Sequence, residues 1–260
     1  MHPFLRHDGP IPVVHRGAAG GRNIDLVENT LSAFQRAHSL GFRYFETDVR
    51  VTADGVLVAS HDASLRRVAG ERIRVGDVIW EELSQIPVGG APLPRLTDLL
   101  DTFPDVSFNV DPKVDAAIGP LVDVLVERAV LDRVCIASFS DRRLRWVRAA
   151  LGVRVCTAAG PRELSMAATQ VASGKRLDVP GADVLQIPQW MSRRMLELRG
   201  RSLDLLAAAQ RVEMPVHVWT VNDGSDMQRL LARGVDAVMS DDTALLLEVF
   251  GQHGWQPVHE

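Results

Sequence analysis

Short apolar runs alternate with amphipathic segments along almost the whole chain. The runs are short, apolar and rich in β-branched residues, as buried parallel strands are. Eight such strands are expected near residues 12, 44, 108, 135, 155, 185, 217 and 237, each with a helix after it. Eight βα units in a chain of this length are typical of a (β/α)8 barrel, an α/β fold, with a doubly wound open sheet as the structural rival.

The helical pattern is clearest after the first strand. Apolar residues recur at helical spacing from Leu31 to Leu40. Asn29 or Thr30 is suited to cap the start of this helix, and Gly41 is suited to end it. Gly234 is likewise suited to end the helix predicted over GSDMQRLLARG.

Two segments depart from this rhythm. Residues 62 to about 95 are rich in turn signals, with a short helix expected near Trp80–Gln85. We expect them to form a small insertion after the second strand, so that residues 1–260 make one domain. Residues 191–211 are predicted to be helical, with an interruption near Gly200.

The overall composition narrows the classes of partner. The chain of 260 residues is 46% hydrophobic and carries a formal net charge of −4, which gives no general attraction to nucleic acid or to an anionic membrane surface. Its longest apolar runs fall short of the roughly 18 residues that a spanning helix needs. The N-terminal segment lacks the pattern of a signal peptide, and Cys135 and Cys156 suggest free buried thiols, so a cytoplasmic location is expected.

Acidic residues gather where two neighbouring strands end, which is where function sits in a barrel. Glu46 and Asp48 stand two apart in the second strand and therefore leave the same face. Asp111 and Lys113 have the same spacing in the third strand. Three carboxylates make an all-oxygen site, which suits Mg²⁺ or Ca²⁺ better than zinc.

Two histidines and two cations complete the pattern. His15 and His61 follow apolar strand-like runs, and the imidazole pKa of about 6.5 suits a general acid and a general base. Arg16 and Lys113 offer positive charge. A bound cation, two histidines, an arginine and a lysine together favour chemistry on a phosphoryl group.

Each residue taken alone also has a plainer interpretation. A strand-end histidine such as His15 is more often a hydrogen-bonded structural residue, and Glu46 and Asp48 could form a solvated strand face. Trp219 could be plain core, and His217, on the same face of that strand, is a weaker candidate. The joint pattern is more specific than any member, because independent strand ends converge on one chemistry.

The order of several motifs resembles the glycerophosphodiester phosphodiesterase family from about Val13 to Thr243. The motifs are His15-Arg16-Gly17, Glu28-Asn29-Thr30, Glu46-Thr47-Asp48-Val49, Thr52-Ala53-Asp54-Gly55 and His61-Asp62, followed by PRLTDLL (94–100), NVDPK (109–113), ASF (137–139), VWTVN (218–222) and GVDAVMSDD (234–242).

The resemblance implies a TIM barrel with a small insertion after the second strand. It also implies metal-dependent hydrolysis of glycerophosphodiesters to sn-glycerol 3-phosphate and an alcohol, with a small-molecule substrate as the partner and no stable insertion into a membrane. The implied roles are a catalytic pair, His15 and His61; metal ligands, Glu46, Asp48 and Asp111; phosphate-binding residues, Arg16 and Lys113; and a residue of the substrate pocket, Trp219.

Two departures from the family pattern bear on the substrate. The loop 18–27 is longer than usual and has Val27 in place of a proline. Asp111 stands where a glutamate is common in the family. An aspartate at this place is also found in the related sphingomyelinase D group, which releases a cyclic phosphate. A lysophospholipid diesterase or lyase and a non-catalytic glycerophosphodiester-binding protein therefore remain as alternatives. The alcohol headgroup, the choice between Mg²⁺ and Ca²⁺ and the oligomeric state are left open.

Overall fold

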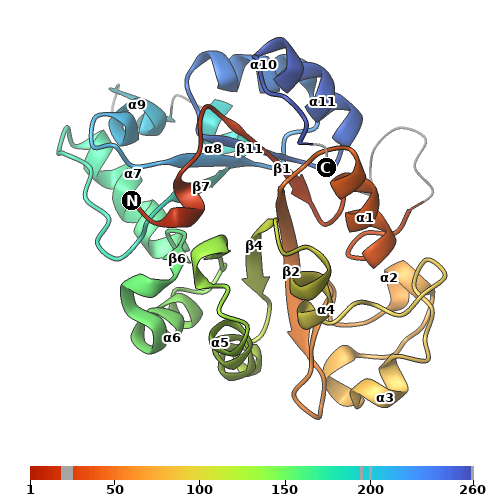
Figure 1. Cartoon of the computed structure of the whole chain (residues 1–260). Helices are drawn as coiled ribbons and strands as arrows, with labels where there is room; N and C mark the ends of the chain where they lie inside the picture. Colours follow the sequence, from red (N-terminus) through yellow and green to blue (C-terminus); the bar gives the residue numbers. More distant parts are fainter. Residues whose placement is uncertain (19–25, 194–195, 199–200, 259–260) are drawn as a thin grey trace.

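A curled parallel sheet surrounded by helices organises the molecule (Figure 1). The computed structural model describes the whole chain except residues 19–25, 194–195, 199–200 and 259–260. Within the described residues, eight parallel strands follow the order β6-β5-β4-β2-β1-β11-β10-β7. They are β1 (Ile11–His15), β2 (Tyr44–Val51), β4 (Ser107–Pro112), β5 (Val134–Ile136), β6 (Cys156–Thr157), β7 (Leu185–Pro188), β10 (Val216–Trp219) and β11 (Ala237–Ser240).

The two ends of this order meet, so the sheet closes into a barrel. Ala158, just after β6, forms a parallel bridge with Val184, just before β7. The amide of Ala159 donates to the Val184 carbonyl at 2.9 Å, and the amide of Asp183 donates to the Thr157 carbonyl at 2.8 Å. All eight predicted strands are confirmed, and the closure favours the barrel over the open sheet.

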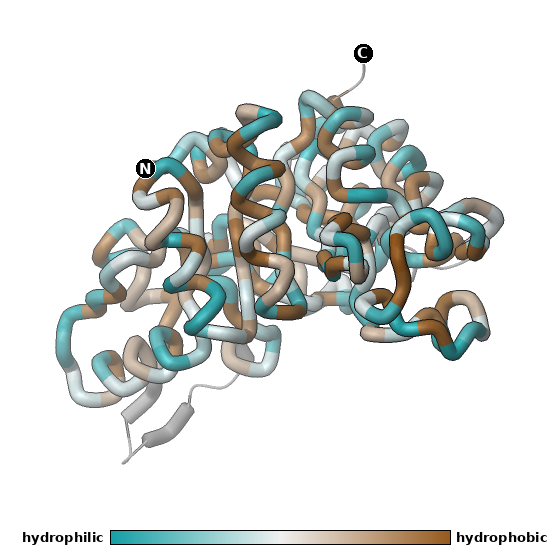
Figure 2. The backbone as a smooth tube through the Cα atoms, turned by 90° about the horizontal axis from the view of Figure 1, so that it is seen from below, coloured by the Kyte–Doolittle hydropathy of each residue, from teal (hydrophilic) through white to brown (hydrophobic). Residues whose placement is uncertain are grey.

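Helices cover the outside of the barrel. They are α1 (Leu31–Ser39), α4 (Leu96–Thr102), α5 (Ile118–Glu127), α6 (Asp141–Leu151), α7 (Pro161–Ala172), α8 (Gln189–Arg193), α9 (Leu205–Gln210), α10 (Gly224–Ala232) and α11 (Thr243–Gln252). Hydrophilic and hydrophobic positions interleave along them in Figure 2, as amphipathic helices require. Between sheet and helices, Phe34 of α1 packs against Phe45 of β2 with ring centroids 5.4 Å apart.

The first helix begins and ends as the sequence predicts. The Thr30 hydroxyl accepts from the amide of Ala33 and so caps α1. Gly41 follows the helix with φ +91°, and a Cβ there would come within 2.8 Å of the Pro257 Cα. Glycine is therefore required both by the left-handed backbone and by the C-terminal segment that packs on it.

The insertion after β2 has its own small core. Strand β3 (Leu57–Ala59) pairs antiparallel with β2 and leads into α2 (Arg66–Ala69) and α3 (Trp80–Leu83). This segment lies at one corner of the molecule, beside α1 and α4 (Figure 1). Its buried apolar side chains form a separate cluster: Val58, Leu65, Val75, Leu83, Val88 and Leu93.

The prediction of a helix over residues 191–211 is wrong. The chain instead forms the short helix α8, then strands β8 (Leu196–Leu198) and β9 (Arg201–Leu203) as an antiparallel pair, then α9. The break expected near Gly200 falls outside the described residues. The apolar spacing within 191–211 is therefore shared between two short helices and a hairpin, a choice that periodicity alone does not make.

None of the helices in the described ranges has both the length and the apolar character needed to cross a bilayer.

Candidate active site

The acidic centre of the site follows from the two-residue period of β2. Glu46 and Asp48 both point into the barrel, where they are 5% and 0% exposed. Glu46 lies in register with His15 of β1 and Asn109 of β4, whereas Asp48 lies in register with Asp111. The two acidic residues therefore occupy successive layers of the barrel interior, with Asp48 nearer the carboxyl ends of the strands.

Cations surround the upper of these two layers. Lys113 Nζ lies 2.5 Å from Asp48 Oδ1 and 2.6 Å from Asp111 Oδ2, and Arg16 Nε lies 2.9 Å from Asp48 Oδ2. Burial alone raises the pKa of Asp48, but Lys113 and Arg16 outweigh it and leave that pKa below its ordinary value. Burial likewise lowers the pKa of Lys113, and the carboxylates of Asp111 and Asp48 reverse this effect, so the pKa of Lys113 is raised.

The lower layer is poorer in positive charge. Burial and the neighbouring Asp48 carboxylate raise the pKa of Glu46 well above its ordinary value. The imidazole of His15 is a nearby cationic partner, with Nε2 3.6 Å from Glu46 Oε2. In the upper layer, burial also raises the pKa of Asp111, although Lys113 opposes this shift.

His15 is held from behind by a carboxylate. Its Nδ1 lies 2.6 Å from Asp241 Oδ1, at the end of β11. Asn222 Nδ2 donates to the other oxygen of Asp241 at 2.7 Å. Burial lowers the pKa of His15, but the charges of Glu46 and Asp241 outweigh burial, so the net pKa is raised. The arrangement fixes the ring and leaves Nε2 directed toward the carboxylates.

His61 is held in the same manner from the insertion. Its Nδ1 lies 2.7 Å from Asp62 Oδ1, and the Nε of Arg67 donates to Asp62 Oδ2 at 2.6 Å. The Nε of Arg50 on β2 donates to the His61 carbonyl at 3.0 Å. The His61 side chain is 37% exposed, compared with 13% for His15. The second histidine therefore stands at the mouth of the barrel.

The segment before α1 ties both histidine regions together. Asn29, with φ +58°, donates from Nδ2 to Asp48 Oδ2 at 3.2 Å, and its Oδ1 accepts from the Thr47 hydroxyl. Glu28 accepts two hydrogen bonds from the Arg67 guanidinium, at 2.7 and 2.9 Å. The Glu28-Asn29-Thr30 motif therefore supplies an ion pair with the insertion, a hydrogen-bond donor to Asp48 and the cap of α1.

The three acidic side chains fit a divalent cation by their donor atoms. Glu46 Oε2, Asp48 Oδ1 and Asp111 Oδ1 are buried and have no hydrogen-bond partner, although Lys113 lies beside Asp48 as an ion pair. Hard cations take such carboxylate oxygens. In the described part of the chain no three acidic, histidine or cysteine side chains already stand in metal-binding geometry, and the Lys113 ammonium lies between Asp48 and Asp111.

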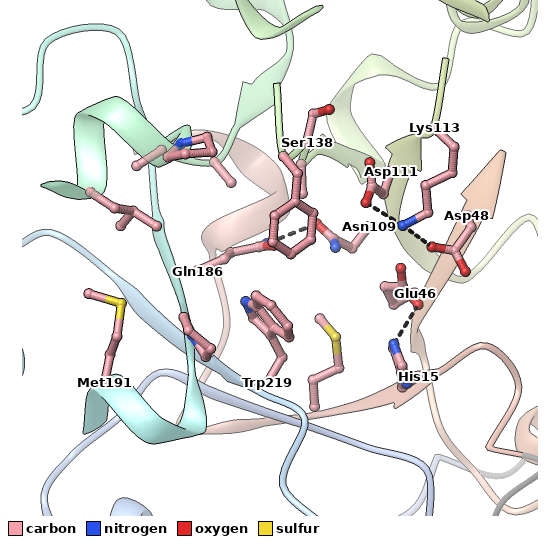
Figure 3. Close-up of a pocket in the computed structure, with 18 of the residues that line it drawn as sticks. His15, Glu46, Asp48, Asn109, Asp111, Lys113, Ser138, Gln186, Met191 and Trp219 are labelled. Atoms are coloured by element: carbon pink, nitrogen blue, oxygen red, sulfur yellow. Dashed lines mark hydrogen bonds and ion pairs between the residues drawn. The ribbon is translucent and has the colours of Figure 1, made fainter. Parts of the chain in front are cut away.

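One pocket of about 600 Å³ brings the predicted site residues together. Figure 3 shows that the carboxylates, Lys113 and His15 lie on one side of it, and Met191 and Trp219 lie on the other. The lining includes every predicted site residue: His15, Arg16, Glu46, Asp48, His61, Asp111, Lys113 and Trp219. Their convergence is confirmed, and their individual roles stay predictions.

The sequence reasoning missed several residues of this site. It gave no role in the site to Asp241 or Asp62, which orient the histidines, and it considered Asn29 only as a helix cap. The strand-end position of Asp241 and the His61-Asp62 pair were visible signals. The weaker candidate, His217, lies deeper in the barrel against Phe4, 2% exposed, where burial lowers its pKa to about 3.

Comparisons with known proteins identify one family. Residues 15–245 match the Glycerophosphoryl diester phosphodiesterase family. A probable glycerophosphodiester phosphodiesterase 2 of Mycobacterium tuberculosis is 36% identical over 256 residues, which cover 96% of this chain and 94% of that protein.

Two solved structures share the fold at about one-fifth identity. A crystal structure of a glycerophosphoryl diester phosphodiesterase from Silicibacter pomeroyi has a TM-score of 0.80 at 21% identity, covering 99% of this chain and all of that one. A phosphodiesterase from Oleispira antarctica, in complex with the product sn-glycerol-3-phosphate, has a TM-score of 0.72 at 21% identity and covers 95% of this chain and 97% of that one. The chain belongs to the glycerophosphoryl diester phosphodiesterase family.

Proposed function

We propose that this protein hydrolyses glycerophosphodiesters to sn-glycerol 3-phosphate and an alcohol, with a divalent cation and with His15 and His61 as the acid/base pair. The observation that carries the proposal is the meeting of three buried carboxylates with two carboxylate-anchored histidines in one pocket. Family membership and the names of the relatives support the same reaction.

The charges of the pocket suit a phosphodiester anion. Glu46, Asp48 and Asp111 would hold a divalent cation, which neutralises phosphate charge and makes phosphorus more open to attack. Lys113 and Arg16 flank the same carboxylates and are placed to contact the non-bridging phosphate oxygens. Because Lys113 pairs with Asp48 and Asp111 in this structure, it would share its charge between those carboxylates and the substrate.

The two histidines supply opposite proton transfers. One takes a proton from the attacking water as its oxygen bonds to phosphorus, and the other gives a proton to the alcohol oxygen as the P–O bond breaks. Asp241 and Asp62 bind Nδ1 of the two rings and so leave each Nε2 available for a proton. The reaction consumes one water, and both histidines return to their starting charge once the base releases its proton to solvent and the acid takes one up.

The direct test is release of sn-glycerol 3-phosphate from glycerophosphocholine. We expect turnover with Mg²⁺ or Ca²⁺, loss in EDTA, and loss in His15→Ala and His61→Ala. Full activity in EDTA would remove the cation from the proposal, and wild-type rates in either histidine variant would remove the acid/base pair. Binding of glycerophosphodiesters without turnover would identify a binding protein instead.

The nature of the product separates hydrolysis from cyclisation. If the substrate's own glycerol hydroxyl attacks phosphorus, a cyclic phosphate accumulates and is visible by ³¹P NMR. We expect the monoester and no lasting cyclic species, because membership of the phosphodiesterase family supports hydrolysis. The cytoplasmic location stays a prediction.

A further inference from the structure

A second pocket of about 410 Å³ adjoins the candidate active site. It shares His15 and Arg16 with the larger pocket, so the two cavities meet at these residues. This second cavity, here called the side pocket, is closed by the end of β11, by the segment before α1 and by α2 of the insertion. Its further lining residues are Leu26, Val27, Glu28, Arg67, Val68 and Asp241.

The side chain of Arg16 reaches both pockets. Its Nε lies 2.9 Å from Asp48 Oδ2, in the larger pocket, and its Nη1 lies 3.4 Å from Glu28 Oε1, in the side pocket. The Arg16 backbone has φ +52°, which few residues other than glycine adopt. Hydrogen bonds from its amide to the Glu46 carbonyl and from the Asn29 amide to its own carbonyl hold it there. A phosphate bound by this guanidinium lies where the pockets meet, so the two arms of a diester can enter different pockets.

The side pocket offers anionic hydrogen-bond acceptors. Asp241 accepts from Asn222 on Oδ2, and its Oδ1 lies 2.6 Å from Nδ1 of His15. A carboxylate has about four lone-pair positions, so Asp241 keeps acceptor capacity for about two further donors. Its side chain is 33% exposed, which leaves that capacity within reach of a ligand. Glu28, which already accepts from Arg67, adds a second negative charge to the same cavity.

Aromatic rings are absent from the described lining of the side pocket, apart from the imidazole of His15. Its apolar residues are the aliphatic Leu26, Val27 and Val68. A quaternary ammonium group has no N–H to donate and is recognised by aromatic faces, whereas a primary ammonium group donates to carboxylates. Size does not distinguish the two, because a choline group of about seven non-hydrogen atoms takes about 200 Å³ at roughly 30 Å³ for each water-sized group. The lining therefore favours an N–H donor by its chemistry.

We propose that the side pocket binds the alcohol arm of the phosphodiester and prefers an alcohol with a primary ammonium group, such as ethanolamine, to one with a quaternary ammonium group. This inference rests on the proposed function. The ammonium group donates to Asp241 and Glu28, while the phosphate contacts Arg16. The glycerol arm carries no charge and occupies the larger pocket beside Trp219.

The first experiment measures binding without turnover. The dissociation constants of phosphoethanolamine, phosphocholine and ethyl phosphate are determined by calorimetry in the presence of Mg²⁺. Phosphoethanolamine should bind about fivefold more tightly than either of the others, the effect expected of one partly exposed ion pair. Binding of phosphoethanolamine no tighter than that of phosphocholine would overturn the proposal, whether or not the protein hydrolyses glycerophosphodiesters.

The second experiment compares turnover of glycerophosphoethanolamine, glycerophosphocholine and glycerophosphoethanol. We expect kcat/KM to be about fivefold higher for glycerophosphoethanolamine than for the other two. If the diesters are hydrolysed and glycerophosphoethanolamine has no advantage, the side-pocket inference fails and the proposed function stands. If none is hydrolysed, the proposed function fails and the titration of the phosphomonoesters decides the inference.

Two variants of one residue locate the effect. Val68 of α2 lines the side pocket and is half-buried, so Val68→Lys and Val68→Glu disturb the packing alike but bring opposite charges. Lysine should remove the preference for phosphoethanolamine over phosphocholine, and glutamate should increase it about threefold to fivefold. The matched control is Gln85→Lys, at an exposed position of the insertion outside both linings, and it should leave the preference unchanged.

The direction of the two shifts decides the assignment. Changes of the same sign in both Val68 variants, or an equal change in the control, would contradict it. Thermal unfolding identifies a variant that does not fold, and in that case the wild-type titration and the remaining variant decide.

Discussion

Two carboxylates of β2, in successive layers of the barrel interior, have opposite electrostatic character. The upper layer places Asp48 between Lys113 and Arg16, and the pKa of Asp48 is lowered. The lower layer places Glu46 beside His15 at 3.6 Å, and burial together with Asp48 raises the pKa of Glu46. One strand face therefore carries a carboxylate that is stabilised as the anion and another that is not.

This difference shows which carboxylate is compensated by cations within the fold and which is not. Asp48 makes contacts that neutralise its charge within the protein itself. Glu46 meets less positive charge, and its Oε2 has no hydrogen-bond partner. A buried carboxylate of this kind is costly unless a cation compensates it.

Asp48→Asn should cause the largest loss. It removes the charge that Lys113 and Arg16 both contact, and breaking such a buried pair costs about 3–5 kcal/mol of unfolding free energy. Because the pKa of Asp48 is lowered, wild-type stability from this group is present above pH 3.8 and declines as pH falls toward the lowered pKa. Activity should fall about 10²- to 10³-fold.

Urea unfolding at neutral pH and glycerophosphocholine turnover measure these two effects. Asp123→Asn, at an exposed position on α5, is the control and should change neither. Unaltered stability of Asp48→Asn would mean that Lys113 and Arg16 do not depend on Asp48 for their charge compensation.

Glu46→Gln should remove activity yet stabilise the cation-free fold. Above the ordinary value of 4.5 the unfolded chain releases the Glu46 proton while the folded chain keeps it, because the folded pKa is raised. Wild-type stability therefore declines with rising pH until the raised pKa is passed, and glutamine removes this decline. The variant should gain about 1–2 kcal/mol at mildly alkaline pH and little at pH 4.5.

Thermal unfolding in EDTA across this pH range tests the gain. Glu127→Gln, at an exposed position of α5, is the matched control. A variant less stable than wild type at alkaline pH would show that Glu46 is compensated in the fold after all.

Asp241→Asn should slow turnover about 10- to 100-fold, the range for residues that orient a functional histidine. Asp241 raises the pKa of His15, so its removal should move the limb of the kcat/KM profile that belongs to His15 to lower pH. A purely structural role would change the rate without moving the limb. In a His15→Ala background the substitution should have no further effect, and additive losses would contradict the orienting role.

Arg67→Ala should have the smallest effect. Arg67 links Asp62 to Glu28, but its side chain is 50% exposed, and such ion pairs contribute about 0–1 kcal/mol. We expect a two- to fivefold fall in kcat/KM, the fold change that such an energy gives, through looser placement of His61. Arg66→Ala, the exposed neighbour, should behave as wild type in the same assay. A fall in kcat/KM as large as that of Asp241→Asn would show that Arg67 positions His61 more strongly than its exposed ion pairs indicate.

The strands and the site residues could be predicted because both depend on a short period. Alternation places Glu46 with Asp48, and Asp111 with Lys113, on one face without any knowledge of distant contacts. Helix α1 was equally predictable, because its cap and its glycine stop lie next to it in the sequence. Local rules are sufficient where the determining atoms are local.

The sequence-based predictions fail where the local structure depends on contacts between residues remote in the sequence. The segment 191–211 has apolar spacing that suits a helix, a hairpin or a mixture of both, and the fold selects the mixture. The pairing of Asp241 with His15 joins residues 226 positions apart and depends on β11 lying beside β1. Neither outcome follows from the intrinsic helix or strand preference of the residues, because each depends on the segments that pack against them.

The sequence by itself determined the βα rhythm, the faces of the strands and the kinds of side chain at their ends. Only the tertiary structure decided that the sheet closes between β6 and β7, which cations face each carboxylate, and that Met191 and Trp219 lie opposite them in the pocket. The physical reason is that charge compensation and cavity shape depend on distances between strands remote in sequence, whereas face and period are properties of a single strand.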